Sequence, residues 1–326
     1  MPSRDVLYLN EHDLRSVGID WGSAIEVIRR AVGCLAADDF AQPIKPYLRY
    51  RDARNRLIAM PAFVGGAFHA AGLKWIASFP GNLARGLPRA HSVVVLNDAE
   101  TGAPTAIINT ALLSVIRTVA VSGLVMKVFD AARPLRDFKL GVTGFGPIGR
   151  HHVEMALAVF GDRLREVCVY DVQPPALTAG EARAGRVRIA ARWEDAYADA
   201  DVFIACTVSP RRYIDRRPRP GSLQLNVSLR DYDLAVFDDL KHGIVVDDWD
   251  EVCREATDIE LFHQARGLGR DGVKTLADVV LGDAMAAYPA AQAIMFNPMG
   301  MGVFDIAMAA HYASRARAGG VGVRLT

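Results

Sequence analysis

Hydrophobic and polar positions in the first third of the chain follow two periods. Between residues 21 and 38 the apolar positions, such as Ala24, Ile28 and Val32, have the spacing of one helix face. Short apolar runs follow, and Asp98-Ala99-Glu100-Thr101-Gly102 has the composition of a hairpin turn. The candidate strands are 46–51, 56–60, 70–77, 91–97 and 103–109. This region is predicted to be an α+β domain with an antiparallel sheet.

A long apolar helix is predicted for residues 110–131, and beyond it strands and helices alternate. The candidate strands are 138–143, 166–171, 187–190, 201–206, 222–228, 243–247 and 293–296. This alternation predicts an α/β fold with a Rossmann-type, doubly wound parallel sheet. A last helix over 303–317 is expected to return to the first domain. We therefore expect an α+β domain formed by residues 1–117 with 303–326, and a Rossmann domain over residues 118–302.

Residues 140–149 have the pattern of a buried strand, a glycine-rich turn and a helix start. Gly144 permits a tight turn, Gly146 lets the backbone approach a pyrophosphate, and Gly149 lets the helix lie close to the sheet. Pro147 and Ile148 begin the helix, whose free N–H groups favour phosphate. The turn is therefore predicted to bind a dinucleotide; the alternative is a glycine turn that binds nothing.

An acidic residue follows the next predicted strand. Asp171 lies about 20 residues beyond Gly149, where a carboxylate typically binds the adenosine ribose hydroxyls. Such a carboxylate repels the extra phosphate of NADP, so the sequence predicts NAD as the cofactor. Met299 and Gly300, after the last strand, suit either close approach of the nicotinamide ring or plain packing.

Further polar residues lie at the predicted carboxyl ends of parallel strands, where ligands bind in such folds. Cys206 and Thr207 end the predicted fourth strand and Ser228 ends the next, so these three are expected beside the cofactor. Asp231 follows closely. Its carboxylate has the chemistry to take a proton from an amine or from water, and an ordinary loop aspartate is the alternative.

Several cations emerge from apolar segments of the first domain. Lys74 lies in an apolar strand, Arg117 lies in the long helix, and Lys45 or Arg49 lies in a proline-containing segment. Burial of such charges is costly unless an anion meets them. They therefore predict a pocket for an anionic substrate, with internal salt bridges as the alternative. His91 either faces this pocket or merely begins a strand.

Composition narrows the functional classes. The 326 residues carry a formal net charge of +1, so no global field attracts nucleic acid or an anionic membrane. Arg117 lies near the middle of the longest apolar stretch, which favours a buried helix over a membrane span. The four cysteines lack C-x-x-C spacing and are typical of reduced thiols. We therefore expect a cytoplasmic protein without a metal site that acts on a small molecule.

These residues together resemble the ornithine cyclodeaminase and mu-crystallin family over nearly the whole chain. The matching segments are Gln42-Pro43-Ile44-Lys45, Gly72-Leu73-Lys74-Trp75-Ile76, Arg117-Thr118, the glycine turn, and Asn226-Val227-Ser228 with Asp231. Within the family, the chain is most similar to dehydrogenases that release 2,3-diaminopropionate in siderophore and peptide-antibiotic pathways. The stretches that distinguish this group are 74–82, 87–92, 245–249 and 297–301.

The resemblance implies a Rossmann domain joined to a substrate-binding domain that also forms the interface of a homodimer. It implies that the secondary amine of N-(1-amino-1-carboxy-2-ethyl)-glutamate is oxidised with NAD. The imine is then hydrolysed to 2,3-diaminopropionate and 2-oxoglutarate. Arg117, Lys74 and Lys45 or Arg49 would hold the substrate carboxylates. Asp231 and Lys74 are the candidate catalytic residues, with Asp231 as the base.

Three other functions stay open at this point. An ornithine-type cyclodeaminase reduces and reoxidises NAD within one cycle. A ketimine reductase or amino-acid dehydrogenase transfers hydride toward an imine. A crystallin-like relative binds its ligand without catalysis, and the presence of Lys74, Arg117 and Asp231 argues against this last reading.

Overall fold

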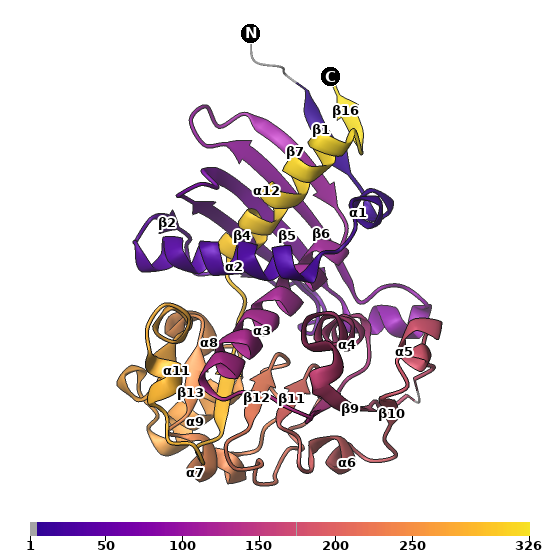
Figure 1. Ribbon diagram of the computed structural model, residues 1–326. Helices are drawn as coiled ribbons and strands as arrows, with labels where there is room; N and C mark the ends of the chain where they lie inside the picture. The colour runs from indigo at the N-terminus through magenta and orange to yellow at the C-terminus, as the bar shows by residue number, and fades with distance from the viewer. Residues whose placement is uncertain (1–4, 174) are drawn as a thin grey trace. The chain divides into compact units, whose positions relative to one another are not determined.

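The computed structural model describes residues 5–173 and 175–326, which form two compact units (Figure 1). Unit 1 comprises Met1–Ala120 with Gly300–Thr326, and unit 2 comprises Val121–Met299. Each unit is built on its own eight-stranded sheet. Helix α3 (Leu112–Ala132) begins in unit 1 and ends in unit 2. It is long and apolar enough to cross a membrane, but 78% of its most apolar 18-residue segment is buried inside the protein, as in a core helix.

Unit 1 contains a largely antiparallel sheet in the order β16-β1-β7-β6-β5-β4-β2, with β3 paired to β4. Its strands are β1 (Val6–Leu9), β2 (Phe40–Ala41), β3 (Tyr47–Leu48), β4 (Arg56–Val64), β5 (Ala70–Ser78), β6 (Ala90–Asp98), β7 (Pro104–Asn109) and β16 (Val323–Leu325). Its helices are α1 (Glu11–Val17), α2 (Trp21–Ala36), the 3-10 helix η1 (Pro80–Arg85) and α12 (Gly302–Gly319). The predicted α+β character with an antiparallel sheet is confirmed.

Long-range pairing explains what the sequence missed in unit 1. The predicted hairpin is confirmed: β6 pairs antiparallel with β7, and the Thr101 N–H donates to Asp98 Oδ1 at 2.8 Å. The unpredicted strands β1 and β16 are short, and they pair with each other from opposite ends of the chain, with Val6 opposite Leu325. Local pattern alone carries no signal for such a pair.

The central strands of unit 1 have two different faces, because side chains alternate along a strand. Met60, Lys74 and Val94 are cross-strand neighbours on one face, and all three are buried. Helix α12 crosses the sheet and packs on β4, β5 and β6 (Figure 1). Leu73 and Trp75 point to the opposite face and are only half-buried. Lys74 is therefore a buried lysine on the face that carries the core of the unit.

Unit 2 contains a parallel sheet in the order β10-β9-β8-β11-β12-β15-β13-β14. Its strands are β8 (Phe138–Thr143), β9 (Leu164–Tyr170), β10 (Val187–Ile189), β11 (Val202–Ala205), β12 (Leu223–Asn226), β13 (Ile244–Val246), β14 (Lys274–Thr275) and β15 (Ile294–Asn297). Its helices are α4 (Pro147–Phe160), α5 (Ala179–Arg183), α6 (Trp193–Tyr197), α7 (Phe237–Leu240), α8 (Trp249–Val252), α9 (Asp258–Arg266), α10 (Leu276–Val280) and α11 (Ala284–Ala287). The 3-10 helices are η2 (Gly161–Arg163), η3 (Leu234–Val236) and η4 (Arg270–Gly272).

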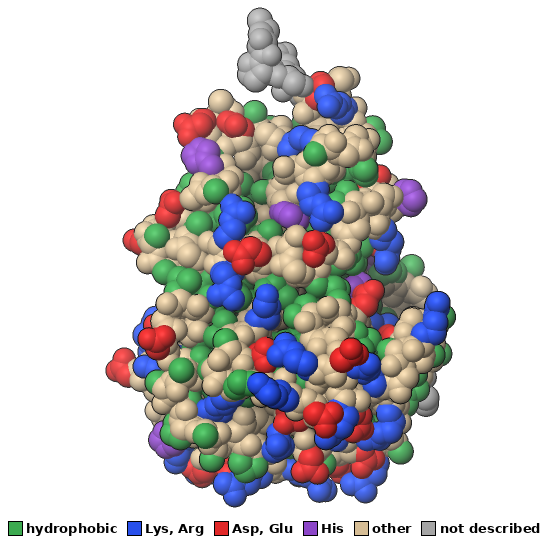
Figure 2. Space-filling view, viewed as in Figure 1, with side chains coloured by type: hydrophobic (Ala, Val, Ile, Leu, Met, Phe, Trp, Pro, Cys, Tyr) green, Lys and Arg blue, Asp and Glu red, His purple; other side chains and the backbone are tan. Residues whose placement is uncertain are grey.

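Counted from β8, the first five strands of this sheet have the order 3-2-1-4-5 of a Rossmann fold. The prediction that residues 201–206 form the fourth strand is confirmed, because β11 pairs with β8. The chain reverses direction across the sheet between β8 and β11, and ligands bind at such a switch point. On the face shown in Figure 2, Lys and Arg side chains are interspersed with Asp and Glu over both units, in keeping with the net charge of +1.

Candidate functional site

The glycine turn of unit 2 needs two of its three glycines for its own packing. Gly144 has a φ of +85°, and a Cβ there would lie 2.5 Å from the carbonyl oxygen of Cys206. A Cβ on Gly149 would lie 2.1 Å from the carbonyl oxygen of Gly144. The turn therefore brings the start of α4 directly against the ends of β8 and β11.

Gly146, by contrast, faces open space. It is the N-cap residue of α4, no side chain caps the helix there, and a Cβ on Gly146 would meet nothing within 4 Å. Pro147 follows at the first helical position, so the first turn presents backbone N–H groups such as those of Ile148 and Gly149. An uncapped helix start beside an unfilled position fits the pyrophosphate of a dinucleotide.

Asp171 directly follows β9 and contacts the glycine turn. Its Oδ2 accepts a hydrogen bond from the Phe145 N–H at 2.6 Å, and its Oδ1 accepts one from the Gln173 N–H at 3.0 Å. The carboxylate therefore lies at the edge of the turn, in the place where the sequence predicts a ribose-binding acid.

Two of the side chains predicted to contact the cofactor, Thr207 and Ser228, form hydrogen bonds to Asp231. Thr207 Oγ donates to the Asp231 carboxylate at 2.8 Å, and Ser228 Oγ donates to its Oδ2 at 2.6 Å. The thiol of Cys206 donates to the carbonyl oxygen of Gly144 at 3.0 Å, and burial raises its pKa far above the ordinary value. These three side chains therefore support the turn and the candidate base.

Asp231 is only 1% exposed, and burial raises the pKa of its carboxyl group, partly offset by the hydrogen bonds from Ser228 and Thr207. Its own N–H donates to Asp258 Oδ2 at 3.2 Å, and Arg212 Nε donates to Asp258 Oδ1 at 2.7 Å. Sequence reasoning missed Asp258 and Arg212. A buried acid at the first position of a helix was the available signal, but its partner lies 46 residues away.

Met299 ends unit 2 and is tied to another acid. Its N–H donates to Asp247 Oδ1 at 3.0 Å, and its side chain packs against the hydrophobic core of the unit. Gly300, predicted beside it as a cofactor contact, belongs to unit 1.

In unit 1, two of the predicted cations share one acid. Lys74 Nζ donates to Asp305 Oδ1 at 3.0 Å, and Arg117 Nε donates to the same oxygen at 2.9 Å. Both cations therefore form internal salt bridges with Asp305. Sequence reasoning missed Asp305, whose signal is a lone carboxylate in the apolar final helix.

Burial shapes the charge of this cluster. Burial lowers the pKa of Lys74 to about 8, against the opposing effect of Asp305 and with the help of Arg117 and Lys45. Burial raises the pKa of Asp305, but Arg117 and Lys74 outweigh it and hold the pKa below its ordinary value. The Oδ2 atom of Asp305 is buried and has no hydrogen-bond partner among the described residues. An unsatisfied buried oxygen is typical of a site that a ligand or water completes.

The structure separates Lys45 from Arg49. Lys45 is buried, its Nζ donates to the Gly300 carbonyl oxygen at 2.7 Å, and it lowers the pKa of Lys74. Gly300 has a φ of +86°, and a Cβ there would lie 2.8 Å from Arg117 Nη1. Lys45, Lys74, Arg117, Asp305 and Gly300 therefore form one group, which we call the cation cluster.

Arg49 and His91 lie outside the cation cluster. Arg49 is exposed and stacks on the ring of Tyr47 at 5.1 Å. His91 is exposed and pairs with Ala77, three positions from Lys74 on the alternating strand, so it points to the opposite face of the sheet. His91 therefore does not lie on the face that carries the cation cluster. No group of three or more His, Cys, Asp or Glu residues suited to a metal occurs in residues 5–173 and 175–326.

Comparisons with known proteins identify the family of the chain. The family model described as ornithine cyclodeaminase/mu-crystallin matches residues 20–320. The N-((2S)-2-amino-2-carboxyethyl)-L-glutamate dehydrogenase of Staphylococcus aureus is 32% identical, over 99% of both chains. The alanine dehydrogenase of Archaeoglobus fulgidus is 26% identical, over 94% of this chain and 93% of its own.

The fold also has solved counterparts. The Delta(1)-pyrroline-2-carboxylate reductase of Thermococcus litoralis, determined with NADH and L-proline, superposes with a TM-score of 0.86 at 22% identity. The match covers 98% of this chain and all of that one. The predicted fold class is thus confirmed independently. From the glycine turn, the cation cluster and the match over residues 20–320, the chain belongs to the ornithine cyclodeaminase/mu-crystallin family.

Proposed function

We propose that this protein oxidises N-(1-amino-1-carboxy-2-ethyl)-glutamate with NAD and hydrolyses the resulting imine to 2,3-diaminopropionate and 2-oxoglutarate. The chain is an NAD-dependent oxidoreductase, the enzyme class and cofactor that its relatives share. The choice of substrate follows the relative that is 32% identical over its full length. The observation that carries the proposal is the cation cluster, because the substrate of that relative is an amine with several carboxylates.

The cation cluster is proposed to hold substrate carboxylates. Arg117 and Lys74 are fixed by Asp305, and Lys45 is fixed by the Gly300 carbonyl, so the positive charges are in place before an anion arrives. Preorganised charges of this kind position a bound substrate without further cost of ordering. Because these cations are buried away from water, the electrostatic attraction between each of them and a carboxylate is stronger than it would be in bulk solvent.

Asp231 is proposed as the base. Bound NAD would supply the acceptor for the hydride that leaves the carbon beside the amine nitrogen. The amine must be neutral for its lone pair to form the C=N bond, and Asp231 takes that proton. Burial raises the pKa of Asp231, which makes it a better proton acceptor than an exposed carboxylate. Asp231 then releases this proton to solvent, and its carboxylate takes a proton from the water that attacks the imine carbon. Transfer of that proton to the nitrogen and cleavage of the C–N bond give the amine and the 2-oxo acid.

The glycine turn is proposed to hold the dinucleotide. The open start of α4 is assigned to the pyrophosphate, with Gly146, Pro147, Ile148 and Gly149 against it. Asp171 is assigned to the ribose hydroxyls. Ser228, Thr207 and Cys206 support this site through the hydrogen bonds already described, and Met299 through its backbone.

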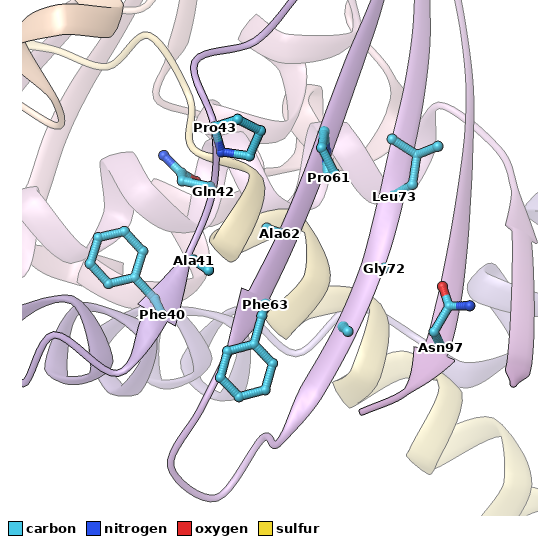
Figure 3. A pocket seen from close by; sticks show the side chains of 11 residues that line it. Phe40, Ala41, Gln42, Pro43, Pro61, Ala62, Phe63, Gly72, Leu73 and Asn97 are labelled. Atoms are coloured by element: carbon cyan, nitrogen blue, oxygen red, sulfur yellow. The ribbon is translucent and has the colours of Figure 1, made fainter. Parts of the chain in front are cut away.

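Unit 1 is proposed to form a homodimer through the half-buried face of its sheet. Cross-strand neighbours Pro61, Leu73, Val95 and Ile107 form an apolar row on that face. An open pocket there is lined by Phe40, Pro43, Pro61, Phe63, Leu73 and neighbouring residues (Figure 3). Apolar surface of this kind is stabilised by burial against a second copy.

Absorbance at about 340 nm, where NADH absorbs, tests the reaction. The protein is incubated with NAD and either N-(1-amino-1-carboxy-2-ethyl)-glutamate, alanine, ornithine or proline, and products are identified by mass spectrometry. Net NADH with 2,3-diaminopropionate and 2-oxoglutarate in equal amounts is expected from the first substrate. Product without net NADH would identify a cyclodeaminase. NADH from alanine or proline would identify an amino-acid dehydrogenase. The absence of both NADH and product with all four compounds would overturn the proposal.

A further inference from the structure

A second cationic position lies on the same face of the unit 1 sheet, outside the cation cluster. Arg56 begins β4, and its Nε is buried without a hydrogen-bond partner among the residues that the structure describes. The Arg56 guanidinium lies 5.6 Å from the centre of the Tyr47 ring, on which Arg49 also stacks. The aromatic ring stabilises the positive charge but accepts no strong hydrogen bond. A buried guanidinium N–H that lacks an acceptor is costly, and an anionic ligand would supply one.

The strand register places Arg56 relative to Lys74. Arg56 is opposite Ser78 on β5, and Lys74 lies four residues before Ser78 on the same strand. Because side chains alternate, Arg56, Ser78 and Lys74 belong to one face, with their rows about 13 Å apart along the strand. Arg56 and Lys74 are thus two cationic positions on one face, and their separation is of the order that an extended small molecule spans.

The row between them contains Ile58 and Ile76 and ends in a polar residue, Ser92. Ile76 lies opposite Ser92, and Ser92 Oγ is 3.4 Å from Ser114 Oγ. Ser114 precedes Arg117 by about one helical turn on α3. The Ser92 and Ser114 hydroxyls therefore lie between the rows of Arg56 and Lys74, beside the isoleucines of the same row, whereas the other end of the strands is buried under α12.

The charges on this face match an acid with more than one anionic end. In the cation cluster, Asp305 offsets one of the three positive charges of Lys45, Lys74 and Arg117. The proposed substrate carries three carboxylates, whereas alanine and proline carry one each. A guanidinium at the far row supplies the cation that the extra carboxylate requires.

We propose that Arg56 binds the side-chain carboxylate of the glutamate part of the substrate and makes the enzyme selective for a distal acid. This inference rests on the proposed function and adds the residue that determines specificity. Tyr47 holds the guanidinium in place, and the unsatisfied N–H donates to the carboxylate.

Kinetics with a matched pair of substrates test this assignment. Wild-type protein, Arg56→Gln and the surface control Arg15→Gln are compared on N-(1-amino-1-carboxy-2-ethyl)-glutamate and on its side-chain amide. Arg56→Gln is expected to lower kcat/KM for the acid by about 10- to 100-fold and to leave kcat/KM for the amide unchanged. Arg15, whose exposed side chain pairs with Glu11, should change neither. Equal losses for both substrates, or no loss for the acid, would overturn the role of Arg56.

A binding measurement separates this inference from the proposed reaction. The Kd values of 2-oxoglutarate and 2-oxobutyrate, which lacks the distal carboxylate, are measured in the presence of NADH by fluorescence. Arg56→Gln is expected to raise the Kd of 2-oxoglutarate at least about 10-fold and to leave the Kd of 2-oxobutyrate unchanged. If wild-type protein shows no turnover but this contrast holds, the reaction is wrong and the acid-binding position stands. If turnover occurs and the contrast is absent, or neither oxo acid binds, the position is wrong.

Discussion

Lys74 and Asp305 form an ion pair whose two side chains are 2% and 1% exposed, with Nζ and Oδ1 3.0 Å apart. The pair joins β5 to α12, and Arg117 on α3 donates to the same oxygen. One carboxylate therefore fixes the positions of two buried cations. It also sets how much positive charge unit 1 offers to an anion.

Replacing Asp305 by Asn should destabilise the protein strongly. The substitution leaves Lys74 and Arg117 buried without their shared anion, and breaking such a pair typically costs about 3–5 kcal/mol. Urea unfolding followed by circular dichroism measures the loss. Asp52→Asn, which removes an exposed partner of Arg54, is the control and should have a much smaller effect. Similar midpoints for the two variants would contradict the structural role of Asp305.

The pH dependence of substrate binding should reflect Lys74. Its pKa of about 8 means that the ammonium is charged below that pH and neutral above it, so kcat/KM for a carboxylate substrate should fall as pH rises through about 8. In Lys74→Arg the guanidinium stays charged, and the fall should move to higher pH. An alkaline limb that stays in place in this variant would assign the titration to another group.

The same shift has a consequence for stability. The folded pKa of Lys74 lies below the ordinary value of 10.5, so the unfolded chain binds more protons between about 8 and 10.5. The contribution of Lys74 to the free energy of unfolding should therefore rise with pH across this window. The free energy of unfolding of wild type and of Lys74→Met is measured in urea at a pH of about 8 and at a pH of about 10. The difference between the two proteins should be larger at the higher pH. A difference that does not change with pH would contradict the lowered pKa.

Asp231→Asn should separate catalysis from cofactor binding. Loss of the proposed base should lower kcat by roughly 10²–10⁴-fold, while the Kd of NAD stays nearly unchanged. Because burial raises the pKa of Asp231, wild-type activity should rise with pH through that pKa as the carboxylate ionises. The control is Asp233→Asn, a nearby acid that caps η3. Turnover near the wild-type level in Asp231→Asn would remove the proposed base.

Asp171→Ala should weaken the binding of NAD and reduce the preference of the protein for NAD over NADP. The substitution removes the acceptor of the Phe145 N–H and the charge that repels a ribose phosphate. The Kd values of both cofactors, measured by fluorescence, give the preference. Asp162→Ala, at a fully exposed acid of unit 2, serves as the control. An unchanged preference in Asp171→Ala would contradict the ribose assignment.

Leu73→Glu should disrupt the proposed homodimer. A charge in the centre of the apolar row opposes burial of that face. Light scattering after size-exclusion chromatography is expected to give twice the chain mass for wild type and the chain mass for the variant. Leu325→Glu, at an exposed apolar position of β16, should remain dimeric. A monomeric wild type would rule out the assembly.

The sequence predicted those features that depend on neighbouring residues. The strand, the glycine turn and the helix start at residues 140–149 follow from local steric and hydrogen-bonding requirements, so they could be predicted from the residues themselves. The doubly wound parallel sheet, with residues 201–206 as its fourth strand, was also predicted, since parallel strands with intervening helices have few allowed connections. The family and the cofactor could be predicted from local motifs of this kind.

Tertiary structure decided which side chains meet. Strand register, which turns every second side chain to the opposite face, placed His91 away from Lys74 and brought Arg56 to the same face. The choice between Lys45 and Arg49 depended on Gly300, far along the chain. Asp305 and Asp258 gained their roles only when distant segments packed beside them. The sequence by itself determined the local elements and the supply of buried charges, while the partners of those charges were decided by long-range packing, because a charge is stabilised by what lies near it in space.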